Sequence, residues 1–297
     1  MIDRRRPDRP PRPPMAKRMQ RGAYLLPSLF TVANMLLGFY AVVCALRGME
    51  LLAMPDPALV EAGIRLFRRA ALLVFVAAIV DTFDGLIARV TGTESEFGKE
   101  YDSLADVITF GAVPGLLTWL WGLRELHRDA WLLSAFFMIC TATRLARFNV
   151  QHKVVDKRWF VGLPTPAAAG TICSLLFYAP DREWKSWMIG LVAVSLLLVG
   201  LLMVSTFRYR SVKGFDPRKR VSYRVAVPIA ALLLVIYYQP YAFFLILAVA
   251  YTLSGPLLWL WGQFRGRGRS QPDQPPEIRV EPIEPPPPDD DLPPYRR

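Results

Sequence analysis

Long apolar runs alternate with short polar segments along most of this chain. The first run covers about residues 23–46, and further runs begin near residues 64, 99, 130, 162, 186, 225 and 241. Most are close to the roughly 20 residues that an α-helix needs to cross a bilayer. Because a membrane-spanning segment must satisfy its own backbone hydrogen bonds, we expect these runs to be helices. The pattern predicts an all-α, polytopic membrane helical bundle with about eight transmembrane helices.

The polar breaks set the connections between these helices. Residues 47–63 contain two prolines and mixed charges, so they predict an exposed connection that is partly an interfacial helix. The segment TGTESEFG at 91–98 predicts a turn between the second and third helices. Gly111 and Gly115, with Pro114 between them, predict close helix packing and a slight bend in the third helix.

Composition supports a membrane protein. The chain has 297 residues, 53% of them hydrophobic, and a formal charge of +11. A basic protein often binds nucleic acid, but here the apolar runs favour contact with anionic lipid head groups and anionic substrates instead. Residues 1–22 and 263–297 are Pro-rich and strongly charged, so we expect both tails to be disordered.

Basic residues are unevenly distributed among the connections. With a cytosolic N-terminus, the cytosolic segments include the Arg-rich start, the loop at 149–160 and the loop at 208–224. The segments on the other side carry fewer basic residues, apart from Arg65, Arg68 and Arg69 at the start of the second helix. The positive-inside rule therefore predicts cytosolic termini and a cytosolic 91–98 turn. We expect a bacterial cytoplasmic membrane.

Four aspartates interrupt the apolar pattern: Asp81, Asp84, Asp102 and Asp106. A charge at membrane depth costs about 3 kcal/mol or more, so intramembrane carboxylates are functional-site candidates. Spacings of three and four residues place each pair on one helix face. The turn at 91–98 makes the two helices antiparallel, so the pairs converge near the cytosolic end. Oxygen ligands favour hard ions such as Mg²⁺, Mn²⁺ or Ca²⁺, and a pair of such ions is suited to phosphoryl transfer.

Several neighbouring residues fit such a site. Gly85 leaves room for a ligand near the backbone, and Arg89 is placed to bind a phosphate through both guanidinium branches. Arg144 and Arg147 end another helix on the same membrane side and are candidates to hold an anionic substrate group. Asn34, within the first apolar run, has two interpretations: a hydrogen bond that joins helices, or a wall of the active site.

Two other interpretations compete with catalysis. The aspartates could pair with bases such as Arg89 and Lys99 and only join helices. Alternatively, the protein could be a membrane transporter with an acidic ion site. The transporter hypothesis is less favoured because the sequence has no internal repeat and the acids cluster at one end of the spans, not at the midplane.

The motif around these aspartates resembles the signature of the CDP-alcohol phosphatidyltransferase family. It reads Asp-x2-Asp-Gly-x2-Ala-Arg-x8-Gly-x3-Asp-x3-Asp between positions 81 and 106. The resemblance implies that the four aspartates bind two divalent cations, Mg²⁺ or Mn²⁺, and that Asp106 is the general base. The family's CDP-contacting motif positions correspond here to the following residues: Gly85, Ala88, Arg89 and Gly98.

The resemblance also implies a domain organisation. The six-helix family core covers roughly residues 23–207, and residues 208–262 add a basic loop and two further transmembrane helices. Members of the family are commonly homodimers, so we expect the same of this chain.

Softer motifs resemble the membrane-embedded phosphatidylserine synthases. They are LPSLFTVANMLLGFYA at 26–41, SEFGKEYDSLADVITFGAVPG at 95–115, TRLARFNV at 143–150 and FVGLPTPAAAG at 160–170. The implied reaction transfers a phosphatidyl group from CDP-diacylglycerol to L-serine and releases CMP. The alternative within the family is a different acceptor: glycerol phosphate, inositol phosphate or choline.

Overall fold

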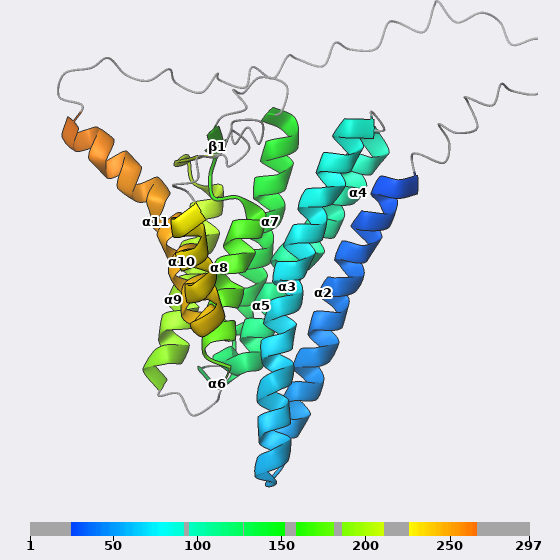
Figure 1. The fold of residues 1–297 in the computed structure, drawn as a ribbon, viewed down its shortest axis with the longest axis vertical. Coiled ribbons are helices and arrows are strands. Elements are labelled where there is room, and N and C mark those ends of the chain that lie inside the picture. Colours follow the sequence, from blue (N-terminus) through cyan, green and yellow to red (C-terminus); the bar gives the residue numbers. More distant parts are fainter. Residues whose placement is uncertain are drawn as a thin grey trace, which may run out of the picture. The chain divides into compact units, whose positions relative to one another are not determined.

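The computed structural model describes residues 25–91, 95–126, 128–151, 159–180, 186–210 and 226–265. The chain divides into two compact units, residues 1–259 and 260–297, and the arrangement described here is that of the first unit (Figure 1). Of the second unit, the structure describes only the C-terminal end of the last helix. The elements are α2 (Leu25–Leu52), α3 (Pro57–Thr91), α4 (Glu96–Asp106), η1 (Val107–Ala112), α5 (Val113–Thr118), η2 (Trp119–Leu123), α6 (Arg124–Leu126), α7 (Trp131–Gln151), β1 (Trp159–Val161), α8 (Thr165–Tyr178), α9 (Ser186–Val204), β2 (Arg208–Arg210), α10 (Ala226–Tyr238) and α11 (Pro240–Arg265).

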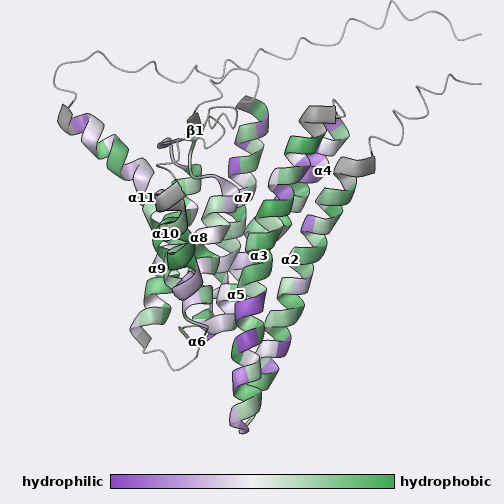
Figure 2. Ribbon diagram, in the orientation of Figure 1, coloured by the Kyte–Doolittle hydropathy of each residue, from purple (hydrophilic) through white to green (hydrophobic). Residues whose placement is uncertain are grey.

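The predicted all-α membrane bundle is confirmed. Within the described ranges, 6 helices are long and apolar enough to cross a membrane, and hydrophobic residues are spread along these helices (Figure 2). The helix α8, with 14 residues, is apolar but shorter than a full span. It starts later than the apolar run at 162 because Gly162 has a positive φ of 79° and Pro164 is the N-cap residue. The protein is therefore an integral membrane protein.

The connection between α2 and α3 is shorter than predicted. The prediction of an exposed connection over residues 47–63 is wrong. The helix α2 continues to Leu52 and α3 begins at Pro57, so the connection is residues 53–56. Asp56 caps α3 by accepting a hydrogen bond from the Ala58 N–H at 2.9 Å. Proline at the first helical position loses no hydrogen bond there. The two helices also approach closely, since a Cβ on Gly63 would lie 2.8 Å from the Gly48 carbonyl oxygen.

The third helical run contains two π-helical stretches, η1 and η2. Pro114, the second residue of α5 after η1, lacks an N–H, so the regular hydrogen-bond ladder is interrupted at this point. Gly111 and Gly115 face α7 closely, as predicted. Added Cβ atoms at these glycines would lie 3.0 Å from Thr141 and 2.9 Å from the Ser134 carbonyl oxygen.

A short antiparallel ladder, which the sequence analysis did not predict, joins the ends of two basic loops. Phe160 of β1 pairs with Tyr209 of β2. Tyr209 is fully buried and its hydroxyl donates to the Thr252 carbonyl oxygen at 3.0 Å. Burial, with a smaller contribution from Tyr251, raises the pKa of Tyr209 to about 12, so the phenol keeps its donor proton at neutral pH.

The last two helices lie where the sequence predicts them. At one end of α11, Tyr241 packs edge-on against Phe177 of α8, with ring centroids 4.8 Å apart. Further along α11, the Thr252 hydroxyl shares a hydrogen bond of 2.8 Å with the Thr171 hydroxyl of α8. The predicted disordered segment at 1–22 and the tail beyond Arg265 lie outside the described residues, as does the basic loop from 211 to 225.

Candidate metal centre and acceptor site

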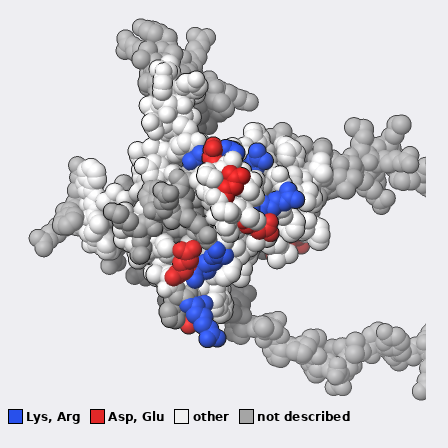
Figure 3. Space-filling view, turned by 90° about the horizontal axis from the view of Figure 1, so that it is seen from below, with Lys and Arg blue, Asp and Glu red and all other residues white. Residues whose placement is uncertain are grey.

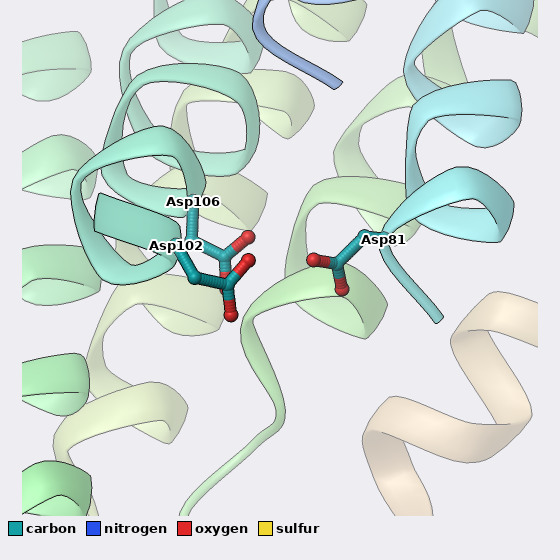
Figure 4. A group of neighbouring side chains, drawn as sticks. All are labelled: Asp81, Asp102 and Asp106. Atoms are coloured by element: carbon teal, nitrogen blue, oxygen red, sulfur yellow. The ribbon is translucent and has the colours of Figure 1, made fainter. Parts of the chain in front are cut away.

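Three aspartates converge between α3 and α4. Carboxylate oxygens of Asp81, Asp102 and Asp106 all lie within 4.8 Å of one another. Figure 4 shows Asp102 and Asp106 projecting from one helix toward Asp81 on the facing helix. The spacing of four residues places the first two on one face of α4, as the sequence predicts.

The fourth aspartate, Asp84, lies outside this group and contacts α2. Its carboxylate accepts a hydrogen bond from the buried Thr31 hydroxyl. This bond ties α3 to α2, and α2 also packs against α4. The sequence analysis did not single out Thr31. The available signal was its position three residues before Asn34, on the same helix face.

Asp106 is the most enclosed of the three converging carboxylates. It is 9% exposed, and its Oδ1 atom is buried with no hydrogen-bond partner among the described residues. Asp106 is also the last residue of α4 before the π-helical η1. Such π-turns occur frequently at functional sites, where they change the direction of side chains.

The donor set fits divalent cations. Three carboxylates this close repel one another unless positive charge lies between them. Mg²⁺ binds oxygen ligands at about 2.1 Å, so ligands on opposite sides of one ion are roughly 4.2 Å apart. The group is therefore wide enough for a cation, and the unpartnered oxygen of Asp106 is available to bind it.

Asn34 lies in the first half of α2, three residues after Thr31. Its side chain is fully buried, and neither amide atom has a hydrogen-bond partner among the described residues. Its backbone carbonyl accepts a weak bond from the Thr109 hydroxyl at 3.4 Å. An unpaired buried amide is costly, so it indicates a group that a ligand completes.

The two arginines near the end of α7, Arg144 and Arg147, differ in their hydrogen-bond partners. Arg144 is 7% exposed, donates from Nη1 to the Thr165 hydroxyl at 2.8 Å, and interacts electrostatically with Asp106. Its Nε is buried without a partner in the described part of the chain. Arg147 instead donates to the Val204 and Ser205 carbonyl oxygens at 2.9 and 3.0 Å. These bonds satisfy carbonyl oxygens at the C-terminal end of α9, which have no partner within their own helix. Arg147 therefore joins α7 to α9, which Arg144 does not.

Further contacts fix the position of α4. The Asn149 amide of α7 donates to the Ser103 hydroxyl at 3.0 Å, next to Asp102 in the chain. At the start of α4, Ser95 is the N-cap residue and accepts from the Gly98 N–H at 2.9 Å. The remaining predicted site residues are less defined: Gly85 lies exposed on α3, and the side chains of Ala88 and Arg89 lie outside the described residues.

Comparison with known proteins agrees with this geometry. The family model for CDP-alcohol phosphatidyltransferase matches residues 24–202. The chain is 30% identical over 243 residues, 80% of its length and 92% of the relative's, to the CDP-diacylglycerol–serine O-phosphatidyltransferase of Helicobacter pylori strain J99. It is 35% identical to the enzyme of that name from Methanocaldococcus jannaschii, over 64% of this chain and 84% of the relative. The Mycobacterium tuberculosis strain H37Rv relative of the same name is 28% identical over 80% of each chain. The match to the family model covers more than half of the chain and includes all four aspartates, so this protein belongs to the CDP-alcohol phosphatidyltransferase family.

Proposed function

We propose that this protein transfers the phosphatidyl group of CDP-diacylglycerol to the hydroxyl of L-serine, giving phosphatidylserine and CMP. The observation that carries the proposal is the cluster of facing carboxylates with an unpartnered Asp106 oxygen, in a member of this family. The serine acceptor is supported by relatives that bear the name of this activity and align with most of the chain.

Divalent-metal dependence is general for the family, and the acidic group supplies suitable ligands. We propose that Asp81, Asp84, Asp102 and Asp106 hold two cations, Mg²⁺ or Mn²⁺. When bound, the cations neutralise phosphate oxygens and stabilise charge on the leaving CMP. Asp84, kept in place by Thr31, would bind from the α3 side. The proposed nucleotide contacts are those of the family motif: Gly85, Ala88, Arg89 and Gly98.

Asp106 is the proposed general base. A serine hydroxyl is a weak nucleophile and needs a base within hydrogen-bond reach. The Asp106 carboxylate takes the hydroxyl proton as the serine oxygen bonds to the phosphorus of the phosphatidyl group. The bond from that phosphorus to the CMP oxygen breaks, and CMP leaves with the electron pair. The enclosure of Asp106 excludes most water, which limits hydrolysis of the donor.

The acceptor site is proposed next to Asp106. Arg144, whose Nε lacks a partner in the described residues, is suited to bind the serine carboxylate. Asn34 offers both a donor and an acceptor for the serine amino or hydroxyl group. The sequence offers Arg147 as an equal candidate. In the structure its hydrogen bonds hold α7 to the end of α9, so we assign it a structural role instead.

The orientation and assembly are also proposals. The excess of basic residues near the aspartate end supports a cytosolic site and cytosolic termini, as in a bacterial cytoplasmic membrane. That orientation lets serine and CMP exchange with the cytosol while the acyl chains stay in the bilayer. The homodimer remains a prediction from the family.

The decisive experiment supplies purified protein with CDP-diacylglycerol and labelled serine, with and without Mg²⁺ or Mn²⁺. Metal-dependent phosphatidylserine formation with CMP release is the expected result. Parallel reactions contain glycerol 3-phosphate, inositol phosphate or choline, and a product from one of these instead would refute the serine assignment. Ion flux through liposomes in the absence of any cytidine nucleotide would support the transporter alternative.

A further inference from the structure

Arg65, Arg68 and Arg69 have no part in the proposed reaction. They lie on α3 at spacings of three and four residues, so they share one face of the helix. Only apolar residues, 70–80, separate Arg69 from Asp81. At 1.5 Å per residue, the arginine is about 18 Å from the aspartate along the helix. These arginines therefore belong to the opposite half of the bundle from the metal centre.

Their depth is unusual compared with the other charges of that half. Arg124 follows Asp106 along the neighbouring helical run by about 27 Å at the same rise per residue. Arg69 is thus roughly 9 Å closer to the aspartate level than Arg124. Since a hydrocarbon core is about 30 Å thick, Arg68 and Arg69 lie within its depth or at its edge. Charged side chains at that depth mark a binding or transport function.

Among the described residues, no acidic side chain neutralises the charge of Arg68 or Arg69. Arg65 forms an ion pair with Glu61, one turn earlier on α3. Among the described residues, no carboxylate lies within ion-pair distance of Arg68 or Arg69. The end view in Figure 3 shows basic and acidic side chains close together on this end of the molecule, within a largely uncharged surface.

Arg68 is also held in place. Its guanidinium lies over the ring of Tyr241 on α11, 4.3 Å from the centroid, and its Nε is buried without a hydrogen-bond partner in the described part of the chain. A freely extending arginine would turn its charge to the aqueous interface. Stacking on a tyrosine instead fixes the planar group between two helices, with its outer N–H donors available.

The same face of α3 offers a track for an acyl chain. Leu72, Val76 and Ile79 continue the face toward the middle of the bilayer at helical spacing, and they are 43%, 38% and 57% exposed. A head group at Arg69 with its chains along this stripe has the orientation of a lipid in the leaflet opposite the aspartates.

We propose that Arg68 and Arg69, with Tyr241 as a support, bind the phosphate of an anionic phospholipid from that leaflet. Guanidinium groups bind phosphate oxygens through paired N–H donors, and two uncompensated charges favour a head group with net negative charge. This site is separate from the metal centre and independent of which acceptor the enzyme uses.

Lipid titration followed by native mass spectrometry tests the proposal. Detergent-purified protein is titrated with phosphatidylglycerol and, separately, with phosphatidylcholine. We expect Arg68→Gln/Arg69→Gln to weaken phosphatidylglycerol binding at least tenfold and to leave phosphatidylcholine binding unchanged. The matched control, Arg124→Gln/Arg128→Gln, removes two charges from the same end and should bind like the unmodified protein. Equal phosphatidylglycerol binding in the two double variants would overturn the proposal.

A second measurement uses the unmodified protein and so does not depend on how the variant folds. Phosphatidylglycerol with a photoreactive group in its head is cross-linked in nanodiscs, and the modified peptides are mapped. Labelling concentrated near Arg69 of α3 and Tyr241 of α11 supports the site, and labelling only elsewhere contradicts it. Millimolar inorganic phosphate should not reduce this labelling. Displacement by phosphate would show a soluble-anion site instead of a lipid site.

Discussion

The two buried polar clusters of this protein are built in opposite ways. Where α8, β2 and α11 meet, the polar groups pair with one another: Thr171 with Thr252, and Tyr209 with the Thr252 carbonyl. Near the aspartates, both amide atoms of Asn34, one oxygen of Asp106 and the Nε of Arg144 are buried without partners among the described residues.

Paired polar groups are typical of a cluster that stabilises the fold, whereas unpaired buried groups are typical of a site that binds a ligand. A paired buried hydrogen bond contributes about 1 kcal/mol, whereas an unpaired group costs about 1–3 kcal/mol. Proteins keep such unpaired groups mainly at functional sites. Substitutions in the first cluster should therefore change stability, and substitutions in the second should change activity.

The largest effect is expected for Asp106→Asn. An amide cannot accept the serine proton, so turnover should fall by about 1000-fold or more, in the upper range for loss of a general base. Binding of CDP-diacylglycerol should remain measurable by equilibrium dialysis with Mg²⁺ present. Substantial turnover in this variant would exclude Asp106 as the base.

Arg144→Gln is expected to act on the acceptor. Loss of a charged hydrogen bond to the serine carboxylate should raise the KM for serine about 10- to 100-fold, with little change in the KM for CDP-diacylglycerol. Arg147→Gln is the control. Because Arg147 bonds to the end of α9, it should lower thermal stability more than it changes the KM for serine. The reverse pattern would exchange the roles of the two arginines.

Asn34→Leu distinguishes a substrate-binding amide from a helix-joining one. The leucine has a similar shape and removes two unpaired polar atoms, so ligand-free stability should stay equal or rise by up to about 1 kcal/mol. Turnover should fall about tenfold if the amide contacts serine. A clear loss of thermal stability in detergent, with normal turnover, would instead identify Asn34 as a structural contact between helices.

The smallest effects on activity are expected in the paired cluster. A Cβ on Gly255 would lie 2.4 Å from the Tyr209 ring, so Gly255→Ala should destabilise the protein by about 1–3 kcal/mol. Tyr209→Phe loses one hydrogen bond and should cost about 1 kcal/mol. Turnover per folded molecule should be unchanged in both, as measured by assay after thermal-shift calibration. A drop in turnover beyond tenfold would connect this cluster to catalysis.

The local features of the fold could be predicted because they depend on neighbouring residues. The length of the apolar runs predicts the helical segments, and α10 and α11 begin close to the expected positions 225 and 241. The prediction for 47–63 is wrong because proline breaks a helix in its interior but is well tolerated in its first turn. Asp56 and Pro57 instead form a helix start, so the break is only four residues long. The π-turns and the β1–β2 ladder depend on hydrogen bonds that periodicity does not encode.

By itself, the sequence determined that four aspartates lie on two helix faces at one end of an apolar bundle, because helical spacing fixes which side chains share a face. Only the tertiary structure decided their separate environments. It brought Asp81, Asp102 and Asp106 together, held Asp84 against Thr31 of α2, and assigned Arg147 to the end of α9 while leaving the Nε of Arg144 unpartnered among the described residues. The reason is physical: spacing along one helix sets direction, but burial and hydrogen-bond partners come from other helices, whose placement depends on packing across the whole bundle.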